Sequence, residues 1–155
     1  MVKYLVDQEV KGDVFPEPFA RTIKHLASPQ TLGTQNIWLG IDEIHPRNSS
    51  NGHAHGGQEE VFFFLSGQGR VKVNEEEIDV EPGHCVLCPM GSFHQVINRG
   101  DTILRFIAVT SPPFTAEGFG SSPSFHHLLP LKGLVHLMEK PRRGGLHPSD
   151  LHPIH

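Results

Sequence analysis

Short runs of alternating apolar and polar residues fill the middle of the chain. Residues 35–44 place Ile37, Leu39 and Ile41 on alternate positions, and a second run rich in β-formers begins at Val61 and ends at a glycine. Alternation with a period of two is typical of a strand that buries one face. The sequence therefore predicts a strand in each of these segments.

The segment GRVKVNEEEIDVEPG predicts a β-hairpin. Val71 and Val73 alternate with charged residues, the polar residues 74–76 supply the turn, and Ile78 and Val80 alternate on the way back. Three more short apolar segments follow at close spacing: HCVLC, FHQVIN and TILRFIAVT. With 16 glycines and 13 prolines between such segments, the fold class predicted is all-β, a sandwich or barrel that closes on itself.

The two ends of the chain differ from this middle. We divide one domain into an N-terminal extension with strands (residues 1–34), a barrel core (35–113) and a C-terminal connector, helix and flexible tail (114–155). A short C-terminal helix before Pro141 is predicted from apolar residues at helical spacing: Leu131, Leu134, Val135 and Met138.

Length and charge narrow the class of protein. A chain of 155 residues fits one domain, which buries roughly 70% of its unfolded surface. The net charge is −4 and the only basic cluster is a short arginine pair, so we expect no nucleic-acid partner. The first residues contain acids and no long apolar stretch, and nothing approaches a membrane span. We expect no membrane partner and a cytoplasmic location.

Cys85 and Cys88 form a C-x-x-C pattern, which suggests a redox pair or half of a zinc site. Their apolar context instead predicts a strand, on which residues three apart face opposite sides. We interpret both as small buried hydrophobic residues, because free cysteine is often buried.

The stretch NGHAHGGQEE has two interpretations. On an extended chain His53 and His55 point to the same face, which is a chelating arrangement. The alternative is a polar surface loop broken by glycines. These ten residues alone do not decide between the two.

Two longer blocks decide between them. In HAHGGQEEVFFFLSG, Glu60 follows the second histidine after four residues and Gly67 follows after six more. In GHCVLCPMGSFHQVIN, fixed intervals separate a second set of residues: Gly83, Pro89, Gly91, His94 and Asn98. The two blocks, 15 residues apart, resemble the paired motifs of the cupin superfamily, and the resemblance covers residues 35–113.

This resemblance implies a small cupin-type double-stranded β-helix, a jelly-roll barrel that binds one divalent metal ion. The matching positions imply four metal ligands: His53, His55, Glu60 and His94. Three imidazoles and one carboxylate suit one divalent transition metal, with Fe, Mn, Zn, Ni and Co as the alternatives. Glu59 is the rival carboxylate, but Glu60 alone lies six residues before Gly67.

The substrate pocket is predicted from residues that share a face with these ligands: Phe62, Phe64, Val96 and Phe106. Such a wall is mainly apolar. Charge for an acidic ligand then comes from the metal or from an arginine, either Arg21 or Arg105, and one sequence does not fix which way each faces.

Two hypotheses on function stay open, because a fold does not choose a chemistry. The first is a metal-dependent enzyme acting on a small oxygen-rich molecule, a sugar derivative or a keto, hydroxy or phenolic acid. Its chemistry is that of a Lewis-acid isomerase, lyase or decarboxylase, or that of a dioxygenase. The second is a non-catalytic cupin that binds or senses a small ligand.

The remaining histidines and apolar residues suggest less. His25, His126 and His127 lie outside both blocks and are interpreted as ordinary surface or hydrogen-bonded residues, and His84 as an exposed turn residue. A homodimer is expected because the N-terminal extension carries apolar residues that need cover: Val14, Phe15, Phe19 and Ile23.

Overall fold

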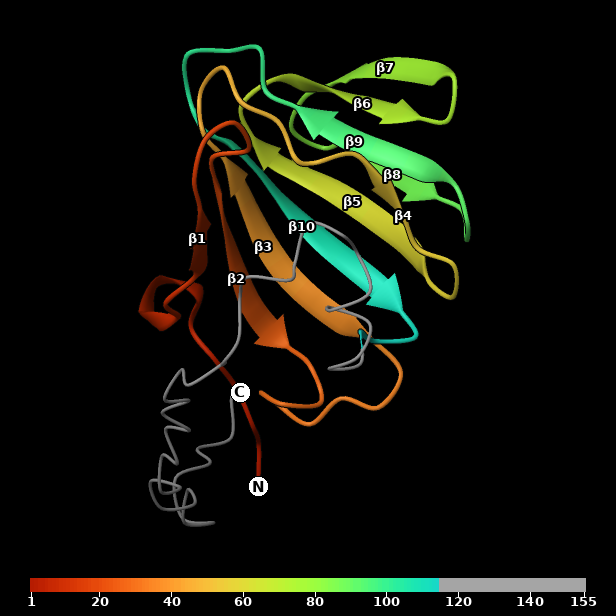
Figure 1. Cartoon of the computed structure of the whole chain (residues 1–155). Helices are drawn as coiled ribbons and strands as arrows, with labels where there is room; N and C mark the ends of the chain where they lie inside the picture. The colour runs from red at the N-terminus through yellow and green to blue at the C-terminus, as the bar shows by residue number, and fades with distance from the viewer. Residues whose placement is uncertain (115–155) are drawn as a thin grey trace, which may run out of the picture.

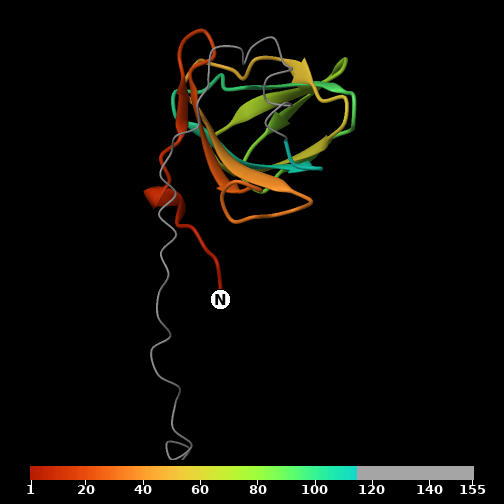
Figure 2. The ribbon, with the colours of Figure 1, turned by 60° about the horizontal axis from the view of Figure 1, so that its bottom comes forward.

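The computed structural model describes residues 1–114, which form two antiparallel sheets that face each other (Figure 1). One sheet has six strands in the order β1-β2-β3-β10-β5-β8, and the other has four in the order β4-β9-β6-β7. Figure 2 shows the two sheets curving around a common interior. The predicted all-β class, a barrel of two sheets that face each other, is confirmed. The predicted C-terminal helix lies outside the described residues.

The strands follow the sequence pattern closely. A single helical turn, η1 (Asp7–Glu9), precedes them. Their bounds are β1 Asp13–Phe15, β2 Arg21–Ala27, β3 Trp38–Ile44, β4 His53–Ala54, β5 Glu59–Ser66, β6 Gly69–Val73, β7 Glu76–Val80, β8 Cys85–Cys88, β9 Phe93–Ile97 and β10 Leu104–Ser111. The predicted hairpin is β6 and β7, and its turn residue Asn74 has a φ of 51°. In residues 1–114 no helix has the length and apolar character needed to span a lipid bilayer.

The N-terminal strands extend the six-stranded sheet. β1 pairs with β2, and β2 pairs with β3 so that Arg21 stands opposite Ile44 and Ile23 opposite Asp42. Cross-strand partners share a face of the sheet. Because Ile44 is fully buried in the core, Arg21 starts from the same inward face.

An apolar core fills the space between the sheets. Phe64, Leu104 and Val71 are fully buried and come from β5, β10 and β6. Rings in this core meet edge to face or tilted, as at Phe62 and Phe106, whose centroids lie 5.2 Å apart. Burial of this kind stabilises the barrel at roughly 25 cal/mol per Å² of apolar surface.

Two residues of the sequence blocks fix the strand ends. Gly67 has a φ of 83°, and a Cβ there would lie 2.6 Å from the carbonyl oxygen of Ile103, so only glycine fits. The buried amide nitrogen of Asn98 lies within hydrogen-bond distance of three carbonyl oxygens, those of Ile44, His45 and Thr102. Asn98 therefore ties the end of β9 to the end of β3 and to the loop before β10.

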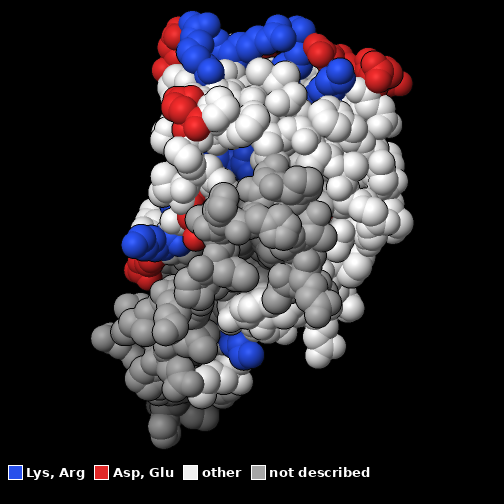
Figure 3. Space-filling view, in the orientation of Figure 1, with Lys and Arg blue, Asp and Glu red and all other residues white. Residues whose placement is uncertain are grey.

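Charged side chains gather at one end of the molecule. Figure 3 shows Lys, Arg, Asp and Glu intermixed at the end where β6 and β7 lie in Figure 1. On these strands Arg70 contacts Glu77 at 3.1 Å and Asp79 at 2.7 Å. Exposed ion pairs contribute about 0–1 kcal/mol each, so these pairs add little to the stability of the fold.

Candidate metal centre

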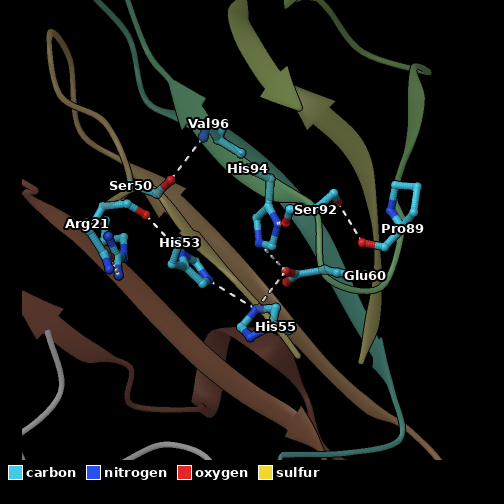
Figure 4. A network of polar contacts seen from close by, with 10 residues as sticks. Arg21, Ser50, His53, His55, Glu60, Pro89, Ser92, His94 and Val96 are labelled. Carbon is cyan, nitrogen blue, oxygen red and sulfur yellow. Dashed lines mark hydrogen bonds and ion pairs between the residues drawn. The ribbon is translucent and has the colours of Figure 1, made fainter. Parts of the chain in front are cut away.

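Two neighbouring strands and a third from the opposite sheet bring four polar side chains together. β4 pairs with β9 so that His53 stands opposite His94, His55 follows β4, and Glu60 comes from β5. One ligand atom from each of these four residues lies within 4.8 Å of the other three (Figure 4). We call this set the donor cluster.

Hydrogen bonds behind the rings fix which imidazole nitrogens face the cluster. His53 Nδ1 lies 2.9 Å from the carbonyl oxygen of Asn51, and His94 Nδ1 lies 3.1 Å from that of Ser92. A carbonyl oxygen only accepts, so in each neutral ring Nδ1–H donates and Nε2 carries a lone pair. Metal-binding histidines are oriented by this kind of bond.

The facing atoms are spaced like the ligands of one metal ion. His53 Nε2 lies 3.0 Å from His55 Nε2, and His94 Nε2 lies 3.0 Å from Glu60 Oε2. The two atoms of the second pair are buried. Ligands bound at about 2.1 Å and at right angles to each other lie about 3 Å apart. The donor cluster therefore fits one divalent transition metal.

The protonation states suit a metal as well. Burial lowers the pKa of His53 to about 4, so this imidazole is neutral at pH 7. Burial raises the pKa of Glu60, but its contacts with His55 and His94 lower it more, and the resulting pKa is about 2. The cluster thus presents an ionised carboxylate beside a neutral nitrogen ligand.

Local geometry selects Glu60 over its neighbour. Glu60 is 7% exposed and points into the cluster, whereas Glu59 is exposed. Gly91, with a φ of 78°, donates its N–H to the carbonyl oxygen of His55 at 2.8 Å. The second sequence block therefore holds the backbone of the first.

Comparison with known proteins identifies the family. The family model described as "Cupin domain" matches residues 40–110, the stretch that contains the whole donor cluster. Residues 40–110 are a cupin domain.

Two curated relatives of this cupin match parts of the chain. The tetracenomycin polyketide synthase protein TcmJ of Streptomyces glaucescens is 29% identical over 87 residues, which is 56% of this chain and 58% of that protein. The oxalate-binding protein of Thermotoga maritima is 27% identical over 85 residues, which is 55% of this chain and 70% of that protein.

Solved structures share the barrel. A predicted oxalate decarboxylase from Thermotoga maritima superposes with a TM-score of 0.65 at 22% identity, covering 72% of this chain and 99% of that one. KdgF from Halomonas sp. gives a TM-score of 0.62 at 16% identity and covers 72% and 94%. At these identities the likeness shows a common fold.

The expected apolar wall lies beside the donor cluster. The Phe62 ring centroid is 6.0 Å from that of His94, and Phe62 also contacts Phe106. Val96 is buried two positions after His94. Phe64 lies deeper, against Phe106 at 5.1 Å between centroids. All four belong to the core of the cupin barrel.

The two arginines left open by the sequence face opposite ways. Arg105 lies on the outer face of the six-stranded sheet, bonded to Glu43 at 3.0 Å and to Asp7. Arg21 is buried on the inner face and donates to the side chain of Asn51. Sequence reasoning missed Asn51, although it stands two residues before His53.

Of the remaining histidines and cysteines, Cys88 lies next to the donor cluster, because it stands opposite Glu60 in the pairing of β5 with β8. His84 is exposed, as expected, while His25 accepts a hydrogen bond from Trp38 and contacts Asp13. Both cysteines are free: Cys88 is buried, and burial raises the pKa of its thiol to about 12. Cys85 is exposed, so the interpretation of two buried cysteines is wrong for Cys85, which points to the outer face of its strand. His126 and His127 lie outside the described residues.

Proposed function

We propose that the donor cluster (His53, His55, Glu60 and His94) binds one divalent transition metal, one of Fe, Mn, Zn, Ni or Co, and that the chain uses it to act on a small oxygen-rich molecule. The observation that supports this most strongly is the convergence of three imidazoles and one carboxylate, each of which offers a ligand atom within 4.8 Å of the others. Such a mixed nitrogen and oxygen set suits this group of metals.

A divalent ion bound there supplies Lewis acidity to the oxygen atoms of a ligand and, if it is iron, dioxygen chemistry. The chain contributes the rest of the site. Glu60 remains a carboxylate far below neutral pH, because its pKa is about 2. We assign Phe62, Phe64, Val96 and Phe106 to the apolar wall that excludes water and packs the carbon frame of the ligand.

Two relatives support an oxygen-rich ligand, since one is named an oxalate-binding protein and the other a polyketide synthase protein. We propose isomerase, lyase, decarboxylase or dioxygenase chemistry on a sugar derivative or on a keto, hydroxy or phenolic acid. A second candidate is ligand binding without catalysis, which the name "oxalate-binding protein" favours.

Elemental analysis of protein purified without chelators tests the metal. We expect close to one transition metal ion per chain, a large loss in His53→Ala, and no loss in His84→Ala, a matched change at an exposed histidine outside the cluster. Wild-type protein that contains no metal, and takes up none on reconstitution, would contradict the proposal. Mass spectrometry then identifies any small molecule that co-purifies with the protein. If the metal-loaded protein converts this molecule to a product, it is an enzyme; if it binds the molecule unchanged, it is a binding protein.

We also propose that the chain forms a homodimer. Among residues 1–114, β1 lies at the edge of its sheet with one side unpaired, and Val14 on this strand is 67% exposed, so a strand edge and an apolar side chain are both available to a second copy. Equilibrium sedimentation at micromolar concentration tests this proposal. The cytoplasmic location remains a prediction from the sequence.

A further inference from the structure

A buried arginine lies beside the donor cluster with part of its hydrogen-bonding capacity unused. Arg21 is 3% exposed, and its Cζ lies 4.5 Å above the ring of Phe15. Nη2 donates to Asn51 Oδ1 at 2.6 Å, but Nη1 is buried and has no hydrogen-bond partner among residues 1–114. A buried charged donor without a partner destabilises the folded state. Such donors are therefore rare outside functional sites.

Asn51 repeats this situation and connects Arg21 to a proposed metal ligand. Its side-chain oxygen accepts from Arg21, its Nδ2 is buried without a partner among the described residues, and its carbonyl oxygen accepts from His53 Nδ1. In the view of Figure 4, His53 lies between Arg21 and Glu60, and Asn51 bonds to both Arg21 and His53. Two orphan donors thus lie next to one edge of the donor cluster.

An acidic side chain shares the inner face with Arg21. Asp42 faces inward, because its register partners Ile23 and Phe106 pack in or against the core. Within residues 1–114 Asp42 and Arg21 form no ion pair, although each is close enough to shift the pKa of the other. Arg21 and Asp42 are therefore two groups of opposite charge on the inner face that do not pair with each other in the described part of the chain.

We propose that Arg21 and Asn51 bind the carboxylate of a small hydroxy or keto acid whose other oxygen reaches the metal. This inference rests on the proposed function, and it narrows the ligand class. The guanidinium matches a carboxylate in shape and charge, and Asn51 Nδ2 adds one more donor. A neutral sugar leaves the positive charge of Arg21 unpaired, and a phosphate dianion meets the carboxyls of Asp42 and Glu60. A hydroxyl next to the carboxylate finds a hydrogen-bond partner in Asp42.

The purely structural alternative is that Arg21 only anchors the segment before β4 through Asn51. Asn51→Asp separates the two interpretations. The new carboxylate keeps the bond to Arg21 and leaves the backbone carbonyl that orients His53, so a structural role survives. For an acidic ligand, however, the same change removes the Nδ2 donor and adds a repelling charge.

Isothermal titration of metal-loaded full chain with lactate, malate and oxalate, and with methyl lactate as an uncharged probe, tests the inference. We expect at least one acid to bind, and its affinity to fall at least tenfold in Arg21→Gln and in Asn51→Asp, while methyl lactate binds weakly to all three proteins. Arg105→Gln, an arginine on the outer face, is the matched control and leaves acid binding unchanged.

Metal content and circular dichroism are measured first for each variant. If Arg21→Gln does not fold, Arg21→Lys and Asn51→Asp decide the question. Metal-loaded wild type that binds none of the three acids overturns the inference and leaves the metal centre standing. Equal acid affinity in wild type and folded, metal-loaded Asn51→Asp overturns it as well. A wild-type chain that takes up no metal instead contradicts the proposed function.

Discussion

Two sides of the barrel interior differ in whether their side chains find partners by packing or hydrogen bonding. Along β5 and β10 the inward residues Phe64, Leu104 and Phe106 are almost fully buried against one another. Beside β2 and β4, the inward groups of Arg21 and Asn51 include donors with no partner in the described part of the chain. The first, apolar set stabilises the fold, whereas the second, which we call the polar wall, lowers its stability. A loss of stability of this kind is typical of a ligand site, whose polar groups are paired only when the ligand is bound.

The largest effect is expected on the apolar wall. Phe64→Ala removes a fully buried ring and leaves a cavity, so we expect the free energy of unfolding to fall by about 3–5 kcal/mol. Urea denaturation measures this. The matched control is Phe63→Ala, the next residue on β5, which is 41% exposed and should change stability by less than about 1.5 kcal/mol. Equal losses in the two variants would show that the interior is not the main source of stability.

A metal ion bound by the donor cluster, next to the polar wall, should raise the stability of the folded chain. At free metal concentrations 100-fold above the dissociation constant, binding adds about 2.7 kcal/mol, which raises the melting temperature of a domain of this size by about 5–10 °C. Differential scanning calorimetry with and without chelator measures the difference. His94→Ala should melt at one temperature under both conditions, and His84→Ala should keep the wild-type difference. A metal-dependent shift that survives in His94→Ala would argue against the donor cluster.

The apolar wall was largely predictable from the sequence, because alternation gives both the strand and its two faces. The inward set Phe62, Phe64 and Glu60 follows from one period-two pattern on β5. The four residues of the donor cluster were predicted from the resemblance of the two sequence blocks to the cupin motifs, a resemblance that rests on the intervals between block residues. The intervals carry this information because turns between the strands fix where the side chains meet. The turn at Gly91, with a φ of 78°, depends only on the local sequence.

The polar wall was not predictable in the same way. On β3 the apolar alternation marks Ile37, Leu39 and Ile41, but the face that looks into the barrel is the other one, with Trp38 and Asp42. Gly40 lies on this inner face because a Cβ there would meet the Trp38 ring at 2.3 Å. The inner face thus carries Trp38, Gly40 and Asp42, which do not form an alternating apolar pattern that would mark it in the sequence.

The same holds for β2 and for the segment before β4. Both faces of β2 mix polar and apolar residues, since Arg21, Ile23 and His25 alternate with Thr22, Lys24 and Leu26. Only the pairing of Arg21 with the buried Ile44 shows which face is inward. Asn51 acts through a loop, and its contact with Arg21 joins residues 30 apart in the sequence, which no local pattern reports.

The smallest effect is expected at Asp42, where the sign depends on pH. Burial raises the pKa of Asp42 to about 7 against the attraction of Arg21, while the charges of Glu60 and Glu43 raise it further. An acid with a raised pKa favours the folded state fully below its unfolded pKa near 3.8, and this contribution is lost as the pH rises through about 7. The difference between these two values corresponds to about 4 kcal/mol at most. Since the side chain is partly exposed, we expect about 1–2 kcal/mol.

Asp42→Asn removes this ionisation, so metal-free Asp42→Asn should be more stable than metal-free wild type by about 1–2 kcal/mol at pH 8 and should lose most of that advantage at pH 4. Urea denaturation of both proteins at the two pH values measures the difference, in which the titration of other groups largely cancels. Asp101→Asn serves as a control because that carboxylate is exposed and paired with Arg47 at the surface. If Asp42→Asn were stabilised equally at pH 4 and pH 8, or destabilised at pH 8, the folded state would not disfavour the ionised form of Asp42. The polar wall would then lower the free energy of unfolding by less than its unpaired donors suggest. The argument for a ligand beside it would rest on Arg21 and Asn51 alone.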